Sequence, residues 1–375
     1  MKKSAIYIHI PFCKVKCIYC DFYSITNREK QIPLFTKLLI EEINSYRRYN
    51  KKKWEFNTIF FGGGTPSILP VKNIEKILIQ LDDVFDISNV KEITLEANPG
   101  EASFNFLNDI KKIGINRLSI GFQSFNDEVL KKLGRYHRSN DCFKTFKNAR
   151  KAGFKNINTD MIFNIPNLST NQWIGDIKKL ISIEPEHISA YSLTVEPSTK
   201  LFNLVKNNKM LMPSEQIDIE QFLITKDILI KNKYFQYEIS NYSKKNMECK
   251  HNLNYWESNP YISFGPSAHS YDTKKRWWNV KSLDKYLSLV GNGKLPVENF
   301  EILKKQDKYN EMILNGLRLT KGISLNKIKK FHKNHLTYLK DLTKKWDCID
   351  LSNGYLKLNK NGMLLVDNIS SDMFI

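Results

Sequence analysis

Three cysteines near the start of the chain, Cys13, Cys17 and Cys20, lie within eight residues of one another, while the other three cysteines are scattered. Thiolates are soft ligands that suit iron–sulfur clusters, zinc or copper(I). A loop with three thiolates could bind three irons of a [4Fe–4S] cluster and leave the fourth iron open to another ligand. The same loop also allows a zinc site, with His9 or Asp21 as the fourth ligand.

Six short β-like runs along the chain are each followed by a segment with helical periodicity. The runs cover Ile6–Ile10, Thr58–Phe61, Glu92–Glu96, Arg117–Gly121, Ile157–Ile162 and His187–Leu193. After the second run, for example, Ile74, Ile77, Leu78 and Leu81 would share one face of a helix. Strands that alternate with helices predict a parallel α/β fold, either a doubly wound sheet or an incomplete (β/α)6 TIM-like barrel.

Polar and glycine-rich residues follow these strands, at the end where α/β folds place their active sites. The stretch Gly62–Pro66 exposes backbone that could approach an amino-acid-like ligand, and a tight turn would explain its glycines equally well. Glu96 and Asp160 could hold ribose hydroxyl groups, and Gln123 follows the fourth strand. Arg135 could pair with a ligand carboxylate, with a solvated helix end as the structural alternative.

The composition indicates a globular protein with a large surplus of basic residues. The 375 residues include 58 Lys or Arg against 39 Asp or Glu, a net charge of +19, and only 9 of the basic residues are Arg. The lysines are spread along the whole chain instead of clustering with aromatic residues, so we expect no nucleic-acid site. With no apolar signal-peptide core near Met1 and no long apolar run, we expect a cytoplasmic location and reduced thiols.

The alternation of strands and helices stops after about residue 235. We therefore predict two domains, over residues 1–235 and 236–375. Within the second, the segments 306–319, 325–331 and 335–346 have helical patterns. Tyr355–Leu358, a turn over Asn359–Gly362 and the apolar Met363–Ile369 predict a hairpin-like end, so we expect a smaller α+β domain, similar to a winged helix.

The motifs together resemble a known family. The cysteine spacing Cys-x3-Cys-x2-Cys follows Tyr-Ile-His-Ile-Pro-Phe, and it is followed by Gly62–Pro66, by Glu96–Pro99 and by Leu118–Phe125. This order closely resembles the radical S-adenosylmethionine (SAM) proteins over nearly the whole chain. Within them it is similar to the oxygen-independent coproporphyrinogen III oxidases and their relatives, the HemW-type heme chaperones. The resemblance implies an incomplete (β/α)6 TIM-like barrel of the radical SAM type with the smaller C-terminal domain.

The resemblance also implies a role for particular residues. Cys13, Cys17 and Cys20 would ligate a [4Fe–4S] cluster, and SAM would chelate its open iron. The positions that match SAM-binding residues of the family are Tyr7, Tyr19, Gly63, Gly64, Thr65, Glu96, Gln123, Arg135 and Asp160. No catalytic residue is assigned beyond these, and whether SAM is cleaved stays open.

Two departures from the oxidase pattern favour the chaperone branch. Cys20 is followed by Asp21-Phe22, whereas the oxidases carry a further cysteine two residues after the third, and only twelve residues precede Cys13. The stretch His251–Trp256 resembles a His-Asn-x-x-Tyr-Trp motif linked to heme, which makes His251 the candidate heme ligand, with packing in the second domain as the alternative.

The resemblance thus implies a heme chaperone that binds a [4Fe–4S] cluster, SAM and heme as cargo. Its partners would be apo-hemoprotein acceptors, such as respiratory enzymes, and a second copy in a homodimer. The alternative is an oxygen-independent coproporphyrinogen III oxidase of heme biosynthesis. A third interpretation, a zinc protein that binds nucleic acid, predicts a colourless protein with salt-dependent RNA affinity.

Overall fold

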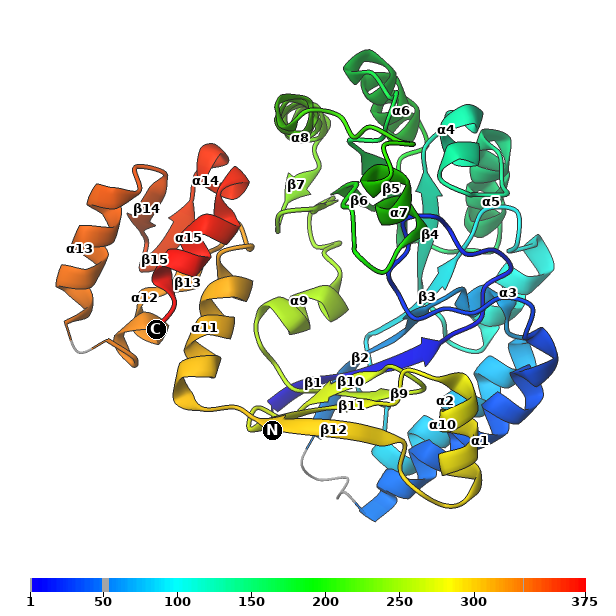
Figure 1. The fold of residues 1–375 in the computed structure, drawn as a ribbon. Coiled ribbons are helices and arrows are strands. Elements are labelled where there is room, and N and C mark those ends of the chain that lie inside the picture. Colours follow the sequence, from blue (N-terminus) through cyan, green and yellow to red (C-terminus); the bar gives the residue numbers. More distant parts are fainter. Residues whose placement is uncertain (1, 49–53, 333) are drawn as a thin grey trace.

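The computed structural model describes residues 2–48, 54–332 and 334–375, and its centre is a curved parallel sheet (Figure 1). The six strands are β1 (Lys2–Ile10), β2 (Trp54–Gly63), β3 (Glu92–Ala97), β4 (Arg117–Gln123), β5 (Ile157–Phe163) and β6 (His187–Ser192). Each pairs in parallel with the next strand along the chain, in the order β1 to β6. Five of the predicted strands lie within these elements, the sixth extends one residue past β6, and the incomplete six-stranded barrel is confirmed.

Helices cover the outer face of the barrel. They are α1 (Ile32–Ser45), α2 (Val71–Phe85), α3 (Phe104–Lys112), α4 (Asp127–Lys132), α5 (Ser139–Lys151), α6 (Thr170–Ser182) and α8 (Glu215–Lys231). The short helix α7 (Lys200–Lys206) lies instead against the segment around Ile18, because Leu201 N–H donates to Ile18 O. Successive strand residues point to opposite faces, so Leu118, Ile120 and Phe122 of β4 pack outward in the core, whereas Ser119 faces the interior cavity. The apolar face predicted for α2 is buried as expected.

Residues 235–302 extend the same sheet on both sides. The strands β7 (Phe235–Gln236) and β8 (Asn241–Ser243) continue it beyond β6. On the other side, β9 (Tyr261–Phe264) pairs in parallel with β1, and β10 (His269–Tyr271), β11 (Lys275–Asn279) and β12 (Val297–Ile302) follow. The helices α9 (Lys250–Trp256) and α10 (Leu283–Gly291) lie between these strands in the sequence. The predicted boundary between residues 235 and 236 therefore falls inside the large sheet.

The C-terminal part forms a second, smaller unit beside the barrel (Figure 1). It contains α11 (Lys305–Gly316), β13 (Ile323–Ser324), α12 (Leu325–Lys329), α13 (His335–Lys345), β14 (Ile349–Ser352), β15 (Tyr355–Leu358), α14 (Lys360–Leu364) and α15 (Val366–Met373). Its antiparallel three-stranded sheet, in the order β13-β15-β14, packs on its own apolar cluster. The three helices predicted here and the α+β class are confirmed.

The predicted end of the chain is wrong in one respect. The strand partners of β15 are β13 and β14, which both precede it, and the residues that follow β15 form the helices α14 and α15. The reason is local, because Asn359 accepts hydrogen bonds from the backbone N–H groups of Asn361 and Gly362 and so caps α14. Among the residues that the structure describes, no helix is long and apolar enough to cross a membrane.

Candidate functional site

The cysteine loop joins β1 to α1 and is fixed by one backbone hydrogen bond across its own base and by others to two segments later in the chain. Cys13 N–H donates to Ile25 O over 2.8 Å, which closes the base of the loop. Ile18 N–H donates to Leu133 O over 3.2 Å, and Leu201 N–H donates to Ile18 O over 2.8 Å. The loop is thereby held against the segments that follow β4 and β6, at the carboxyl ends of the strands. The sequence predicted this position.

The three thiols of the loop have the donors and the setting that a cluster needs. All three are free, Thr65 Oγ1 donates to Cys13 Sγ over 3.4 Å, and Arg135 Nη1 donates to Cys17 Sγ over 3.3 Å. Such donors stabilise thiolates. Burial raises the pKa of Cys13 to about 11 and raises that of Cys20, so loading a metal must release their protons.

The side chains of the loop do not form a ready-made site for a single metal ion. Across residues 2–48, 54–332 and 334–375, no three His, Cys, Asp or Glu side chains are grouped so that they could hold a metal ion. A zinc site needs its ligands to converge on one atom. Each thiolate of a [4Fe–4S] cluster binds a different iron, so these ligands lie farther apart.

The glycines at the end of β2 have a packing reason. Gly63 has φ of +107°, and a Cβ there would lie 2.5 Å from Cε1 of His9. A Cβ on Gly64 would lie 2.6 Å from Phe12 O. The backbone of Gly64 is also close to β1, because its N–H donates to Ile10 O over 2.7 Å. Any larger residue would therefore push β2 away from β1 and the cysteine loop. The same absence of side chains leaves backbone exposed beside the thiols.

Two partly buried carboxyl groups face the inside of the barrel next to this edge. Glu96 accepts a hydrogen bond from Gly63 N–H over 3.2 Å, and burial, together with the nearby Asp160, raises the pKa of Glu96 to about 8. Asp160 accepts hydrogen bonds from Ser119 Oγ over 3.1 Å and Asn158 Nδ2 over 2.8 Å, and burial raises its pKa. A ligand that brings hydroxyl or ammonium donors would stabilise the ionised form of both groups.

Two further polar side chains, Gln123 at the end of β4 and Arg135 after α4, lie at the same place. The register shifts between Gly121 and Gln123, and Gln123 has φ of +67°, so a bulge turns this residue out of the regular strand. Arg135 Nη2 donates to Asn98 Oδ1 over 2.6 Å and to Gly121 O over 3.0 Å. Its buried Nε has no hydrogen-bond partner among the described residues, so this guanidinium can still bind a ligand.

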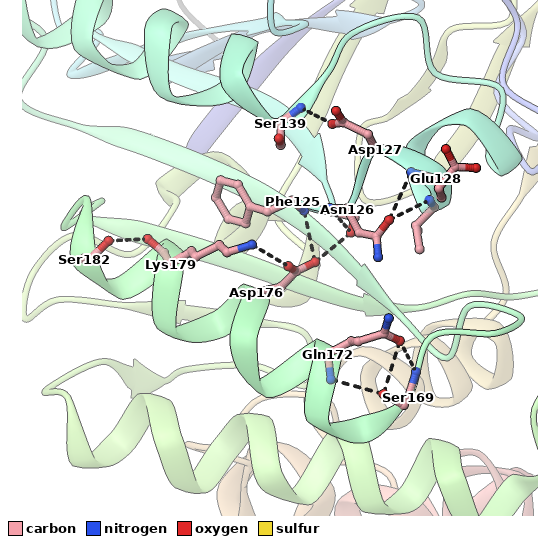
Figure 2. A network of polar contacts seen from close by, with 12 residues as sticks. Phe125, Asn126, Asp127, Glu128, Ser139, Ser169, Gln172, Asp176, Lys179 and Ser182 are labelled. Atoms are coloured by element: carbon pink, nitrogen blue, oxygen red, sulfur yellow. Dashed lines mark hydrogen bonds and ion pairs between the residues drawn. The ribbon is translucent and has the colours of Figure 1, made fainter.

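The loop after β4 is fastened to α6 by Asp176, a buried residue that sequence reasoning missed. Figure 2 shows the Asp176 carboxylate directed at the turn around Phe125, whose N–H donates to it over 3.0 Å, and Ser124 Oγ donates to it over 2.6 Å. An acidic residue on an amphipathic helix is expected to face solvent, so the sequence carries no signal for this role. Asn98 belongs to the predicted motif Glu96–Pro99, and no signal in the sequence indicates that it accepts a hydrogen bond from Arg135.

One cavity of about 1110 Å³ collects these groups at the mouth of the barrel. Every residue that was predicted to bind the cluster or SAM lines it: Tyr7, Cys13, Cys17, Tyr19, Cys20, Gly63, Gly64, Thr65, Glu96, Gln123, Arg135 and Asp160. The far wall comes from the ends of β5 and β6, from α8 and from the segment Met363–Asp367 of the C-terminal unit. The cavity is thus shared between the barrel and that unit.

The predicted heme ligand lies elsewhere. His251 of α9 is 2% exposed, its ring stacks on Phe60 with the centroids 5.0 Å apart, and burial lowers its pKa to about 3. Its Nδ1 is 2.9 Å from Thr58 Oγ1 and its Nε2 is 3.2 Å from Tyr255 Oη. Both ring nitrogens therefore have protein partners. Tyr255 and Trp256 line a separate cavity of about 200 Å³.

Comparison with known proteins gives consistent matches along the chain. Residues 7–180 match the Radical SAM superfamily, and residues 303–365 match the HemN C-terminal domain. A protein of Bacillus subtilis (strain 168) named "Heme chaperone HemW" is 34% identical over 374 residues, which cover 98% of each chain. A protein of the same name from Buchnera aphidicola subsp. Schizaphis graminum is 36% identical and covers 94% of this chain and 92% of its own.

A solved structure shares the fold. The coproporphyrinogen III oxidase (HemN) of Escherichia coli superposes with a TM-score of 0.84, covering 99% of this chain and 89% of its own, at 21% sequence identity. At that identity the likeness establishes the radical SAM architecture with its C-terminal domain, and it leaves the activity open.

Proposed function

Because the chain belongs to the HemW family within the radical SAM superfamily, we propose that it is a heme chaperone that binds a [4Fe–4S] cluster and SAM and transfers heme to apo-hemoproteins. Cys13, Cys17 and Cys20 would hold the cluster. The observation that carries the proposal is the convergence of these thiols and of all the predicted SAM contacts on one cavity.

Different residues around the cavity would bind different groups of SAM. A cluster with SAM on its open iron supplies one-electron chemistry when it is bound. Arg135 donates to Cys17 Sγ and lines the cavity, where its guanidinium would pair with a ligand carboxylate. Glu96 and Asp160 would accept hydrogen bonds from hydroxyl or ammonium groups, and the bare backbone of Gly63 and Gly64 lets a ligand approach closely.

The charges around the cavity support the chaperone over the oxidase. Seven acidic residues line it, Asp21, Glu96, Asp160, Glu196, Glu215, Asp218 and Asp367, against two basic ones, Lys16 and Arg135. Coproporphyrinogen III carries four propionates spread around its ring, so every orientation would bring some of them against carboxylates. Heme has its two propionates along one edge. Asp21-Phe22, where the oxidases have a further cysteine nearby, points the same way.

We also propose that the protein works in the cytoplasm, that its acceptors are apo-hemoproteins such as respiratory enzymes, and that it forms a homodimer.

Heme transfer can be tested with any apo-hemoprotein as the acceptor. Heme-loaded protein mixed with an apo-globin should pass its heme on, and the absorption spectrum of the globin reports the transfer.

Anaerobic reconstitution with iron and sulfide, followed by two parallel assays, tests the function. We expect broad absorption near about 400 nm from the cluster, one heme bound per chain in a titration followed by absorption, and no conversion of coproporphyrinogen III in the presence of SAM and a reductant. Conversion of coproporphyrinogen III without heme binding would replace the proposal with the oxidase alternative.

A further inference from the structure

We propose that heme binds in the part of the large cavity that lies away from the cysteines, and that His251 is a structural residue and not its ligand. This inference rests on the proposed function and adds the location of the cargo. We call this part the distal chamber. Its apolar walls are Phe163, Leu193, Ile219, Phe222, Met363 and Leu365.

The size of the cavity leaves room for a second ligand. Its volume of about 1110 Å³ exceeds the roughly 300–1,000 Å³ of a pocket that takes one drug-sized ligand. The predicted cluster and SAM residues account for one side, which lies at the ends of β1 to β5. The distal chamber shares the end of β5 with that side and is otherwise built from the end of β6, α8, and the segment from α14 to α15.

The walls of the distal chamber suit one face of a porphyrin. Phe163 lies at the end of β5, Phe222 projects from α8, and Leu365 comes from the C-terminal unit, so aromatic and aliphatic groups surround the space. No Lys or Arg is among the described residues that line this part, and Glu215, Asp218 and Asp367 are. A macrocycle would therefore enter with its apolar edge inward and its two propionates toward the opening.

The C-terminal unit is an integral wall of this chamber. Phe222 and Ile239 pack against the apolar cluster of that unit as well as lining the cavity. Lys360 Nζ of α14 lies 3.0 Å from both carboxylate oxygens of Asp227 on α8. The unit is thereby fixed to the barrel along α8, beside the space where the cargo would bind.

The surroundings of His251 argue against a heme there. The cavity lined by Tyr255 and Trp256 measures about 200 Å³, below the roughly 300 Å³ at which ligand pockets begin. Widening it would require α11 to move away, because Glu311 pairs with Arg276 over 2.8 Å and Asn315 Nδ2 donates to Ser258 Oγ over 3.3 Å. Iron would also have to displace a hydrogen bond from one of the ring nitrogens.

Heme titration of matched variants tests the location. Leu365 is 41% exposed on the chamber wall, so Leu365→Asp should fold normally yet place a carboxylate against the macrocycle. We expect its heme affinity to fall about tenfold or more. Leu336→Asp makes the same change at a site of the C-terminal unit that is 72% exposed and does not line the cavity, and it should bind heme as the wild type does.

Two further variants separate the alternatives. Leu365→Trp introduces a bulky apolar side chain instead of a charge, and it should also weaken heme binding because it occupies space in the chamber. His251→Asn should change heme affinity by no more than about twofold, while it lowers the stability of the fold. The inference would be overturned if His251→Asn lost heme binding while both Leu365 variants kept it. If the wild type itself bound no heme, the proposed function would fail instead. Cluster absorption and SAM binding should be unchanged in all of these variants.

Discussion

The cavity at the mouth of the barrel and the contacts that join the barrel to residues 241–302 both contain acidic side chains, and Glu96 in the cavity has fewer hydrogen-bond partners than Glu42 and Glu92 in those contacts. We call the second region the joint. In the joint, the Glu42 carboxylate accepts three hydrogen bonds, from Gly265 N, Asn279 Nδ2 and Tyr286 Oη. Glu92 accepts from two backbone N–H groups of α9. In the cavity, Glu96 has one such contact, and Arg135 Nε has none among the described residues.

For these charged groups, the difference separates those that hold segments together from those that a ligand could complete. A buried group with all its partners holds segments together, whereas a buried group that lacks them is costly unless something else completes it. Substitutions in the cavity should therefore change ligand binding more than stability. Substitutions in the joint should do the opposite. Four predictions test that contrast, in order of decreasing effect.

The largest effect is expected for Cys17→Ser in the cavity. A serine hydroxyl is a poor ligand for iron, so the cluster should fail to assemble and SAM binding should be lost with it. Absorption at about 400 nm after anaerobic reconstitution measures the cluster content. The melting temperature of the metal-free protein should be the same as that of the wild type. Cys142→Ser is the control, because this buried thiol lies on α5 outside the cavity. Equal cluster content in the two variants would remove the assignment.

Arg135→Leu should weaken SAM binding by about tenfold to a hundredfold, since hydrogen bonds to a charged group contribute roughly 1.5–3 kcal/mol each. The side chain now bridges Cys17 Sγ, Asn98 Oδ1 and Gly121 O. Equilibrium binding of SAM to the reconstituted protein measures the loss. Arg138→Leu, an exposed position three residues on, is the control. A drop in melting temperature without a drop in affinity would place Arg135 with the structural groups.

How much of this contrast the sequence could reveal depends on how local its signals are. The cysteine spacing, the strand ends and the glycines at 63 and 64 are local patterns, and the structure brings them together as predicted. The partners of His251 are Thr58, nearly two hundred residues earlier, and Tyr255, and nothing in the motif reveals that packing. The strands β10 and β11 are three and five residues long, too short for a clear alternating pattern, so their place in the large sheet was missed.

In the joint, Glu92→Gln should lower stability by about 1.5–3 kcal/mol, because the carboxylate accepts charge-assisted hydrogen bonds from the N–H groups of Lys250 and His251. An amide in its place can accept through only one atom and turns an N–H group toward those donors. Chemical denaturation measures the loss, and Glu75→Gln on the exposed side of α2 should cost little. SAM affinity should stay at the wild-type value. A loss of SAM affinity in Glu92→Gln would contradict the expectation that substitutions in the joint affect stability and not ligand binding.

The smallest effect is a change in how stability depends on pH when Glu42 becomes Gln. Burial raises the pKa of Glu42 from 4.5 to about 7, and the donors Tyr286, Gly265 and Asn279 only partly offset that shift. Between about pH 4.5 and 7 the folded chain thus holds a proton at Glu42 that the unfolded chain has lost. Stability should therefore fall as pH rises through this range, by less than about 1.4 kcal/mol per pH unit from this group.

Glu42→Gln cannot titrate, so its denaturation free energy measured across the same range should fall less steeply with pH than that of the wild type. Glu41→Gln, at the exposed neighbouring position, should keep the wild-type slope. Because Glu42 lies in the joint, SAM affinity at any one pH should be the same in all three proteins. If the pH dependence of stability were the same in Glu42→Gln as in the wild type, the three donors to Glu42 would stabilise its ionised form as well as water does. The joint would then hold a charged carboxylate at neutral pH.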